Sequence, residues 1–172
     1  IRGYGNGRHH LAAVKIYQDG ALGSRGAAMI EPYSDDAENR GLAFYSQEEL
    51  TAMTKRANDL GFQVGTHAIG DLGNRMVLDA FEAAQGGKPS PLRNRIEHAQ
   101  VVTLDDIPRF ADLGVIASMQ PTHATSDMNM AEDRVGPDRI KGGYAWRRML
   151  DSGAIIAARS DFVVEHPNPF YG

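Results

Sequence analysis

The sequence predicts an α/β fold in which helices pack on a parallel sheet. Short apolar runs typical of strands recur along the chain, and stretches with helical periodicity separate them. The five apolar runs cover residues 12–17, 62–66, 95–99, 115–119 and 154–159. Because each helix returns the chain to the same end of the sheet, consecutive strands are expected to run parallel.

The first two expected helices have clear boundary residues. Ser46 opens a capping-box sequence, and apolar residues then follow at helical spacing until Gly61, a typical stop residue. Asp71 is the expected N-cap of the second helix, which ends at Gly86. Both helices therefore lie between consecutive predicted strands.

The third and fourth expected helices are less regular in sequence. Thr103 and Asp106 open the third, and Pro108 falls within its first turns, where proline is tolerated. Gly136 begins the fourth, which is expected to continue to Gly153. Together with the first two, these helices give the alternating order of an α/β domain.

Two long stretches, residues 18–45 and 120–135, lack both periodicities and are expected to be irregular loops. In compact α/β domains, ordered loops of this length are more often functional than idle. The chain opens at Ile1 rather than at a methionine, and it ends in a loop-like stretch. We therefore expect a fragment of a longer chain.

Composition excludes several classes of protein. The 172 residues contain no cysteine, which rules out disulfides and thiolate metal sites. The net charge is -4 and there is no long basic run, so a small molecule is the expected partner and nucleic acid is not. No apolar run approaches the roughly 20 residues that span a bilayer. The expected location is the cytoplasm, with the presence of an upstream signal peptide left open.

Candidate functional residues fall at the carboxyl ends of the predicted strands, where ligands bind in parallel α/β folds. They are Lys15 with Asp19, His67, His98, Gln120 with His123, and Asp161. Imidazoles and carboxylates are ligands that zinc, manganese and iron accept. The residue types at this rim therefore predict a metal site.

Each of these residues also has a structural explanation. Lys15 lies in an apolar run, and a buried ammonium needs a partner or neutralisation. It can face outward from an edge strand, form a buried ion pair or act as a modified ligand. Taken singly, His67 and His98 can be structural histidines, and Asp161 can cap a turn.

Six stretches of the chain resemble the amidohydrolase superfamily, in its amidohydrolase family 3 branch. They are VKIYQDGALGSRGA, VGTHAIGD, RIEHAQVV, RFADLGVIASMQPTHATSDM, AWRRMLDSGA and SDFVVEHPNP, within residues 14–169. That branch includes N-substituted formamide deformylase-like and exoenzyme-regulator-like proteins. The resemblance implies a (β/α)8 TIM barrel, of which residues 1–172 would supply about strands 4 to 8 as one partial catalytic domain.

The resemblance also implies roles for the residues at the strand ends. Lys15 corresponds to a fourth-strand lysine that is often carboxylated and ligates metal, which would remove the burial problem. His67 and His98 correspond to the metal ligands of the fifth and sixth strands. Asp161 corresponds to the eighth-strand aspartate, which binds metal and acts as the general base. The expected substrate-binding residues are Gln120, His123 and Asp127.

The implied function is hydrolysis of an amide-like C–N bond, of N-acyl or formamide type, by water that a divalent metal activates. Zinc is the expected metal, with manganese and iron as alternatives and the number of ions left open. Two other functions stay open. One is a non-catalytic regulatory or scaffold derivative of the barrel, and the other is a metal-free barrel with His98 and Asp161 as acid and base.

The chain departs from the family pattern at two points. The first-strand His-x-His motif is missing, since His9 and His10 have the wrong spacing and context, and barrel strands one to three are absent. Arg159 stands where the family usually has glycine. We therefore expect the isolated fragment to be inactive and to associate with itself through two open sheet edges.

Overall fold

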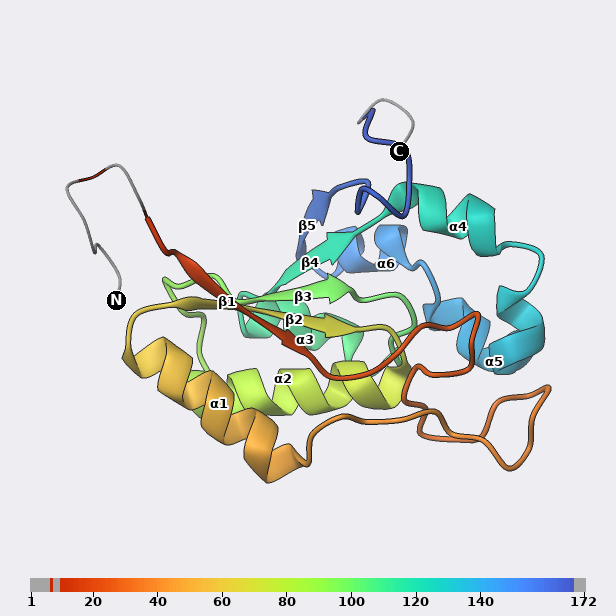
Figure 1. Cartoon of the computed structure of the whole chain (residues 1–172), viewed down its shortest axis with the longest axis horizontal. Helices are drawn as coiled ribbons and strands as arrows, with labels where there is room; N and C mark the ends of the chain where they lie inside the picture. The colour runs from red at the N-terminus through yellow and green to blue at the C-terminus, as the bar shows by residue number, and fades with distance from the viewer. Residues whose placement is uncertain (1–6, 8–9, 169–172) are drawn as a thin grey trace.

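Five parallel strands form one sheet in the computed structural model, which describes residue 7 and residues 10–168 (Figure 1). The strands are β1 (Ala13–Tyr17), β2 (Gln63–Ala68), β3 (Arg95–His98), β4 (Ile116–Met119) and β5 (Ile155–Ala158). They lie side by side in chain order, and each neighbouring pair is parallel. The predicted strands and their direction are confirmed, with ends that differ by a residue or two. His9 lies outside the described residues.

Helices cover one face of this sheet, and Figure 1 shows two of them, α1 and α2, below it. The helices on this face are α1 (Gln47–Asp59), α2 (Asp71–Gln85), α3 (Ile107–Asp112) and α6 (Trp146–Asp151). The main core forms where helix side chains such as Phe81 and Phe110 meet strand side chains such as Val64 and Ile96. Burial of apolar surface of this kind is the dominant favourable term in folding. Within the described residues, no helix combines the length and the apolar character needed to cross a membrane.

The opposite face of the sheet is open in the described part of the chain. Because side chains alternate along a strand, Val14 and Ile16 pack toward the helices while Lys15 and Tyr17 face the open side. Tyr17 on β1 is 54% exposed and Ile155 on β5 is 53% exposed. Parallel sheets are usually covered on both faces, so this exposure is what a partial barrel leaves uncovered.

The predicted capping box at the start of α1 is confirmed. The Ser46 hydroxyl accepts a hydrogen bond from the Glu49 N–H, and the Glu49 carboxylate accepts one from the Ser46 N–H. At α2 the predicted cap is wrong, because the N-cap is Gly70 and Asp71 is the first helical residue. The Asp71 carboxylate instead accepts a hydrogen bond from the Ile30 N–H, which joins the long loop to α2.

The predicted fourth helix is wrong as a single element. It is replaced by α5 (Ala131–Arg139), which is interrupted at Gly136, where φ is 78°. A short 3-10 turn, η1 (Ile140–Gly142), and Tyr144, with a φ of 49°, then separate α5 from α6. The preceding stretch, predicted to be irregular, instead contains α4 (Pro121–Asp127). Left-handed backbone at these two residues therefore divides the segment into short pieces.

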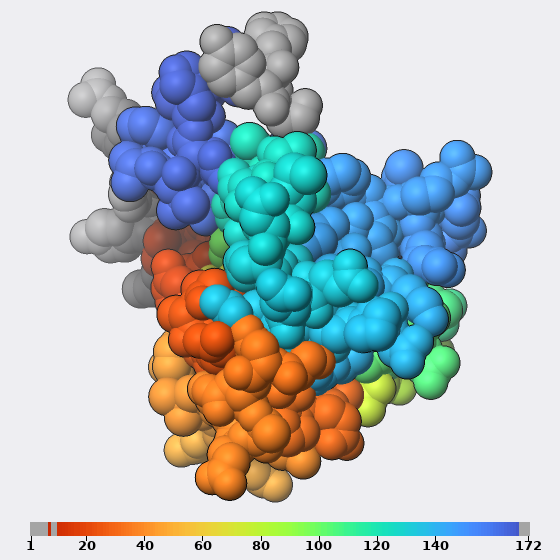
Figure 2. Space-filling view, turned by 90° about the vertical axis from the view of Figure 1, so that its right-hand side faces the viewer, coloured from red at the N-terminus to blue at the C-terminus, as the bar shows by residue number. Residues whose placement is uncertain are grey.

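The long segment between β1 and α1 contains neither a helix nor a named strand, as predicted. It builds a second apolar cluster with the α5 region, and Figure 2 shows the orange segment beside the cyan one. The cluster contains Leu22, Ala27, Met29, Tyr33, Ile69, Val101, Ala131 and Val135. Arg134 pairs with Asp35, and Arg139 donates hydrogen bonds to the carbonyls of Glu31 and Pro32. The loop is therefore anchored along its length.

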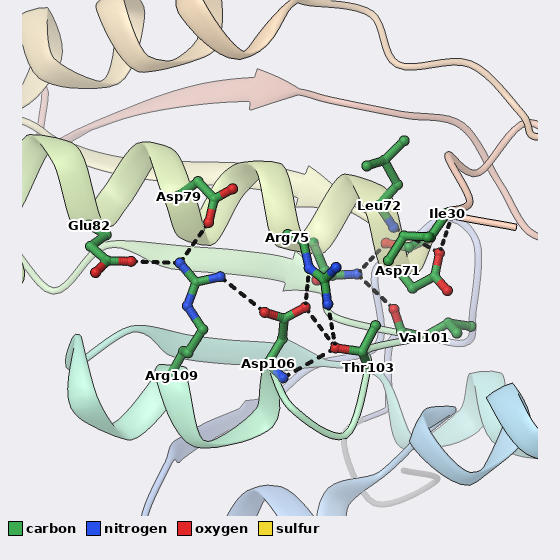
Figure 3. Close-up of polar contacts among 12 residues, drawn as sticks. Ile30, Asp71, Leu72, Arg75, Asp79, Glu82, Val101, Thr103, Asp106 and Arg109 are labelled. Carbon is green, nitrogen blue, oxygen red and sulfur yellow. Dashed lines mark hydrogen bonds and ion pairs between the residues drawn. The ribbon is translucent and has the colours of Figure 1, made fainter.

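A network of ion pairs joins α2 to α3 (Figure 3). The Arg109 Nη2 lies 2.7 Å from carboxylate oxygens of Asp79 and Glu82, and its Nη1 lies 3.0 Å from Asp106 Oδ1. The Arg75 Nε donates to Asp106 Oδ2 at 2.8 Å. Burial alone would raise the pKa of Asp106, but hydrogen bonds from Arg109, Arg75 and a nearby hydroxyl lower it below its ordinary value.

Candidate metal centre

Two of the predicted ligands, His67 and His98, lie against each other at the ends of β2 and β3. Their ring centroids are 4.5 Å apart and their planes meet at 68°. Asp161 follows β5, and its Oδ2 lies 4.0 Å from His98 Nε2. The structure therefore brings these three predicted residues together at one end of the sheet.

His98 is a buried imidazole held in one orientation by Gln120. The Gln120 amide nitrogen donates to the Ser118 carbonyl at 3.3 Å, which leaves the amide oxygen 2.8 Å from His98 Nδ1. The Nδ1 atom therefore carries the hydrogen, and the Nε2 lone pair points toward Asp161. Burial, followed by the neighbouring His67, lowers the pKa of His98 to about 4. The ring is thus neutral at pH 7, the form that binds a metal ion.

His67 contacts Asp19, which lies in the loop after β1. The His67 Nε2 is 3.4 Å from Asp19 Oδ1. Asp19 itself is 1% exposed, and its carboxylate accepts hydrogen bonds of 2.8 to 3.0 Å from the N–H groups of Ala28, Ile69 and Gly70. Asp19 therefore fixes the loop against the end of β2 and limits the positions open to the His67 ring.

Of the three explanations left open for Lys15, a buried ion pair is excluded, because the side chain is not buried. Its neighbours Val14 and Ile16 pack on the helices, so alternation places Lys15 on the open face, where it is exposed. Its Nζ lies 4.8 Å from the ring centroid of Tyr17, within cation–π distance. Desolvation lowers the pKa of Lys15 and the negative charge of Glu97 opposes this. Carboxylation of Lys15 stays a prediction.

Asp161 is already paired with a cation, the guanidinium of Arg159. The Arg159 Nη1 contacts Asp161 Oδ1, and its Nη2 lies 3.1 Å from Glu97 Oε2. Partial burial opposes ionisation of Asp161, but the bond and charge of Arg159 hold the pKa of Asp161 below its ordinary value. The backbone of Asp161 is left-handed, with φ of 57°, as is that of His98, with φ of 78°.

Glu97 belongs to this cluster, although it was not among the predicted site residues. It is 4% exposed, and Oε1 accepts a hydrogen bond of 2.6 Å from Arg95 Nε. Burial would raise the pKa of Glu97, but its hydrogen bonds with Ser118 and Arg95 lower it. The signal in the sequence was the two-residue spacing of Arg95 and Glu97, which places both side chains on the same face of β3.

Of the predicted substrate-binding residues, Gln120 and Asp127 both have partners within the protein. Gln120 holds the His98 ring. The Asp127 Oδ2 accepts hydrogen bonds of 2.8 Å from Gln100 Nε2 and 2.7 Å from the Tyr144 hydroxyl. No sequence spacing pointed to these two partners, because they come from separate loops.

His123 is placed differently from the other two. Its ring stacks on His98, with centroids 5.9 Å apart and planes at 8°. Its Nε2 is buried and makes no hydrogen bond within the described residues, and it lies 3.8 Å from Glu165 Oε1. His123 therefore retains a nitrogen that a ligand can bind.

The donor set at this rim fits a divalent transition metal in chemical kind, since it combines two imidazoles with a carboxylate. Across residues 10–168, however, no three His, Asp or Glu side chains are grouped closely enough to hold an ion. Asp161 is already paired with Arg159, and His67 Nε2 lies 3.4 Å from Asp19 Oδ1, so two of the three donors have other partners in this structure.

Known proteins are similar to this chain over nearly its whole length. A family model described as the amidohydrolase family matches residues 2–172. Protein LONG AFTER FAR-RED 3 of Arabidopsis thaliana is 38% identical, over 94% of this chain and 28% of that protein. N-substituted formamide deformylase of Arthrobacter pascens is 30% identical, over 87% of this chain and 27% of that protein.

The fold is also found in solved structures. The crystal structure of an uncharacterized metal-dependent hydrolase from Pyrococcus furiosus matches with a TM-score of 0.88 and 33% identity, over 99% of this chain and 35% of that chain. The predicted fold class, a partial barrel of the metal-dependent hydrolase type, is confirmed. The chain spans less than a third of the length of the two curated relatives.

Proposed function

The chain belongs to the amidohydrolase family, and from this membership we propose that the protein is a metal-dependent hydrolase that cleaves an amide-like C–N bond. The observation that carries the proposal is the meeting of His67, His98 and Asp161 at the carboxyl ends of β2, β3 and β5. In barrels of parallel strands, that end is where catalytic residues lie. The deformylase named among the relatives supports a substrate of N-acyl or formamide type.

In this proposal His67, His98 and Asp161 hold the metal ion, and Lys15 adds an oxygen ligand once it is carboxylated. Zinc is the metal we propose, because it accepts this mixture of nitrogen and oxygen donors. When bound, such an ion acts as a Lewis acid toward the scissile carbonyl and makes water nucleophilic near neutral pH.

The side chains of the chain itself supply orientation and proton transfer. Asp161 is ionised at neutral pH, because its pKa lies below the ordinary value, and it can accept a proton from the attacking water. The same carboxyl group can then pass that proton to the nitrogen that leaves. His98 keeps one tautomer through its bond to Gln120, so its Nε2 faces the site in a fixed direction.

His123 is the residue we assign to substrate contact. Its buried Nε2 has no hydrogen-bond partner in the described part of the chain, and its ring stacks on His98. A substrate carbonyl or amide beside His98 would come within reach of this nitrogen. Gln120 and Asp127 would support the same region indirectly, through His98 and Tyr144.

Metal content measured on three variants tests the site. We expect His67→Ala and Asp161→Ala to lose most of the zinc or manganese that the wild-type protein retains after dialysis, because each removes one donor. His10→Ala is the control, since His10 is exposed and precedes the amino end of β1, far along the strand from the rim. If His67→Ala and Asp161→Ala both retain metal at the wild-type level, the site assignment fails.

A panel of substrates tests the bond that is cleaved. We expect the metal-loaded protein with a complete barrel to release amine from N-formyl and N-acyl amines, and to lose this activity in Asp161→Asn, which keeps the shape but not the base. Residues 1–172 alone are expected to release none. Amine release can be followed with a primary-amine reagent. If Asp161→Asn releases amine at the wild-type rate, Asp161 is not the general base of the reaction.

A further inference from the structure

We propose that Arg159 is an internal competitor for the metal site, whose guanidinium competes with a divalent cation for the carboxylate of Asp161. This inference rests on the proposed function and deepens it, because it concerns control of the same site. It gives a role to a side chain that otherwise only neutralises its neighbours.

The contacts of Arg159 occupy the carboxylates of the rim. Its Nη1 contacts Asp161 Oδ1, its Nη2 lies 3.1 Å from Glu97 Oε2, and its Nε donates to Ser118 Oγ at 3.1 Å. All three guanidinium nitrogens thus have an oxygen partner. A planar fork with several donors is well suited to bridge two carboxylates.

The named charged groups at the open face carry one more positive charge than negative, without any metal ion. Lys15, Arg95 and Arg159 supply the positive groups, and Glu97 and Asp161 supply the negative ones. A divalent cation added to this cluster would meet an excess of positive charge. Because the carboxylates are shared with arginine, a bound cation has to compete with these groups for the same negative charge.

Arg159 is the group whose displacement concerns the site, because it contacts Asp161 directly and follows β5, the last strand of the described sheet. Release of its guanidinium would free Asp161 Oδ1 and allow the carboxylate to turn toward His98, which is now 4.0 Å from Oδ2. Metal binding and the Arg159–Asp161 pair therefore compete for the same carboxylate.

The affinity for zinc measured by competition with a coloured chelator tests this proposal. We expect Arg159→Gln to bind zinc about tenfold or more tightly than the wild type, since it removes a charge-assisted contact that metal must break. Arg95→Gln is the matched control. It removes the same charge beside the same Glu97, but Arg95 pairs with Glu97 and Gln63, whereas Arg159 also pairs with Asp161.

A general effect of positive charge would strengthen binding equally in both variants, whereas a specific competitor strengthens it mainly in Arg159→Gln. Equal affinities of the two variants, or wild-type affinity in Arg159→Gln, would overturn the inference. Arg159→Lys keeps the charge and the fold but not the fork, and we expect an intermediate affinity. If Arg159→Gln proves unstable in thermal unfolding, the zinc affinity of Arg159→Lys is compared with that of the wild type instead.

A second readout does not depend on affinity. Zinc added to the wild-type protein should shift the NMR signal of the Arg159 Nε–H, which now bonds to Ser118, and leave that of Arg95 in place. An unchanged Arg159 signal in zinc-saturated protein contradicts displacement. If His67→Ala and Asp161→Ala keep full metal binding, the site and this inference fail together. If these two variants lose metal binding while Arg159→Gln has the zinc affinity of the wild type, only the inference about Arg159 fails.

Discussion

Asp19 is a buried carboxylate that main-chain amides, rather than a cation, stabilise. Its three N–H donors come from two segments, the long loop and the start of α2, so Asp19 joins parts of the chain far apart in sequence. Gly73 lies so close that a Cβ there would come within 2.4 Å of Asp19 Oδ2. The space around the Asp19 carboxylate is therefore filled, and a larger side chain at position 19 would not fit.

Replacement of Asp19 by alanine should destabilise the fold. It leaves buried N–H groups unsatisfied, and we expect the free energy of unfolding to fall by about 3 kcal/mol, as measured by urea denaturation. Asp59→Ala is the control, because Asp59 is exposed at the end of α1, and it should change stability by less than about 0.5 kcal/mol. A loss below about 1 kcal/mol in Asp19→Ala would contradict this role.

Individual site residues were partly predictable from the sequence. The register of strand ends correctly brought His67, His98 and Asp161 together, because parallel strands finish at the same rim. The exposure of Lys15 was not predictable. Apolar neighbours before and after it in the sequence are expected whether one face of the sheet or both faces are covered. Arg159 contacts two carboxylates, and its contact with Glu97 depends on tertiary packing. The two residues are far apart in the sequence, so no local pattern predicts this contact.

At the scale of elements, Asp106 ties the start of α3 to α2 through Arg75 and Arg109 (Figure 3). Its pKa is lower in the folded protein than in the unfolded chain, so the stability it contributes is present above the unfolded pKa of about 4. That contribution is lost as the pH falls through the lower, folded pKa.

The variant Asp106→Asn should therefore be less stable by about 2 kcal/mol at pH 7, because two arginines lose their charged partner. We expect the difference from wild type, measured by denaturant unfolding, to narrow as the pH falls below about 4. Asp105→Asn is the control, because Asp105 precedes Asp106 in the sequence and is exposed. A difference that stays constant down to low pH would show that the charge of Asp106 is not the cause.

Helices with strong end signals were predictable, and the others were not. The capping box of Ser46 and Glu49 fixed the start of α1, because both partners are local in sequence. The break between α5 and α6 depends on left-handed backbone at Gly136 and Tyr144. Glycine permits that conformation without requiring it, and tyrosine rarely adopts it, so neither break was predictable from residue type.

At the scale of the whole molecule, the sheet has two unpaired edges in its described part, β1 and β5. The β1 edge borders a groove of about 460 Å³ lined mostly by apolar side chains of β1 and α1. Exposed strand edges beside apolar surface favour pairing with another chain. These features support the expected self-association.

Light scattering at increasing concentration tests this association. We expect the mean mass of the wild-type protein to rise above that of a monomer. Ile155→Lys should reduce the rise, because Ile155 is 53% exposed on the edge strand β5 and a lysine there opposes edge pairing. Leu150→Lys is the control, since Leu150 is 59% exposed but lies on α6. A wild-type monomer at high concentration would contradict the expectation.

The overall fold was the most predictable level. Five apolar runs separated by helical segments leave few arrangements for the chain, since connections between parallel strands follow one hand and short paths. The parallel direction of the strands follows from this alternation. Their sequential order follows from the barrel that the family resemblance implies, since doubly wound sheets share the same alternation. The second apolar cluster was not predictable in this way. Its members, such as Tyr33 and Val135, come from segments about a hundred residues apart with no shared periodicity.

The left-handed backbone at the strand ends has a consequence for design. His98, Ala99 and Asp161 have φ of 78°, 44° and 57°, so two of the three candidate ligands project from left-handed rather than extended backbone. Grafting the same three side chains onto the tips of idealised strands would aim two of them in other directions. A working transplant of this site has to carry its turns along with its side chains.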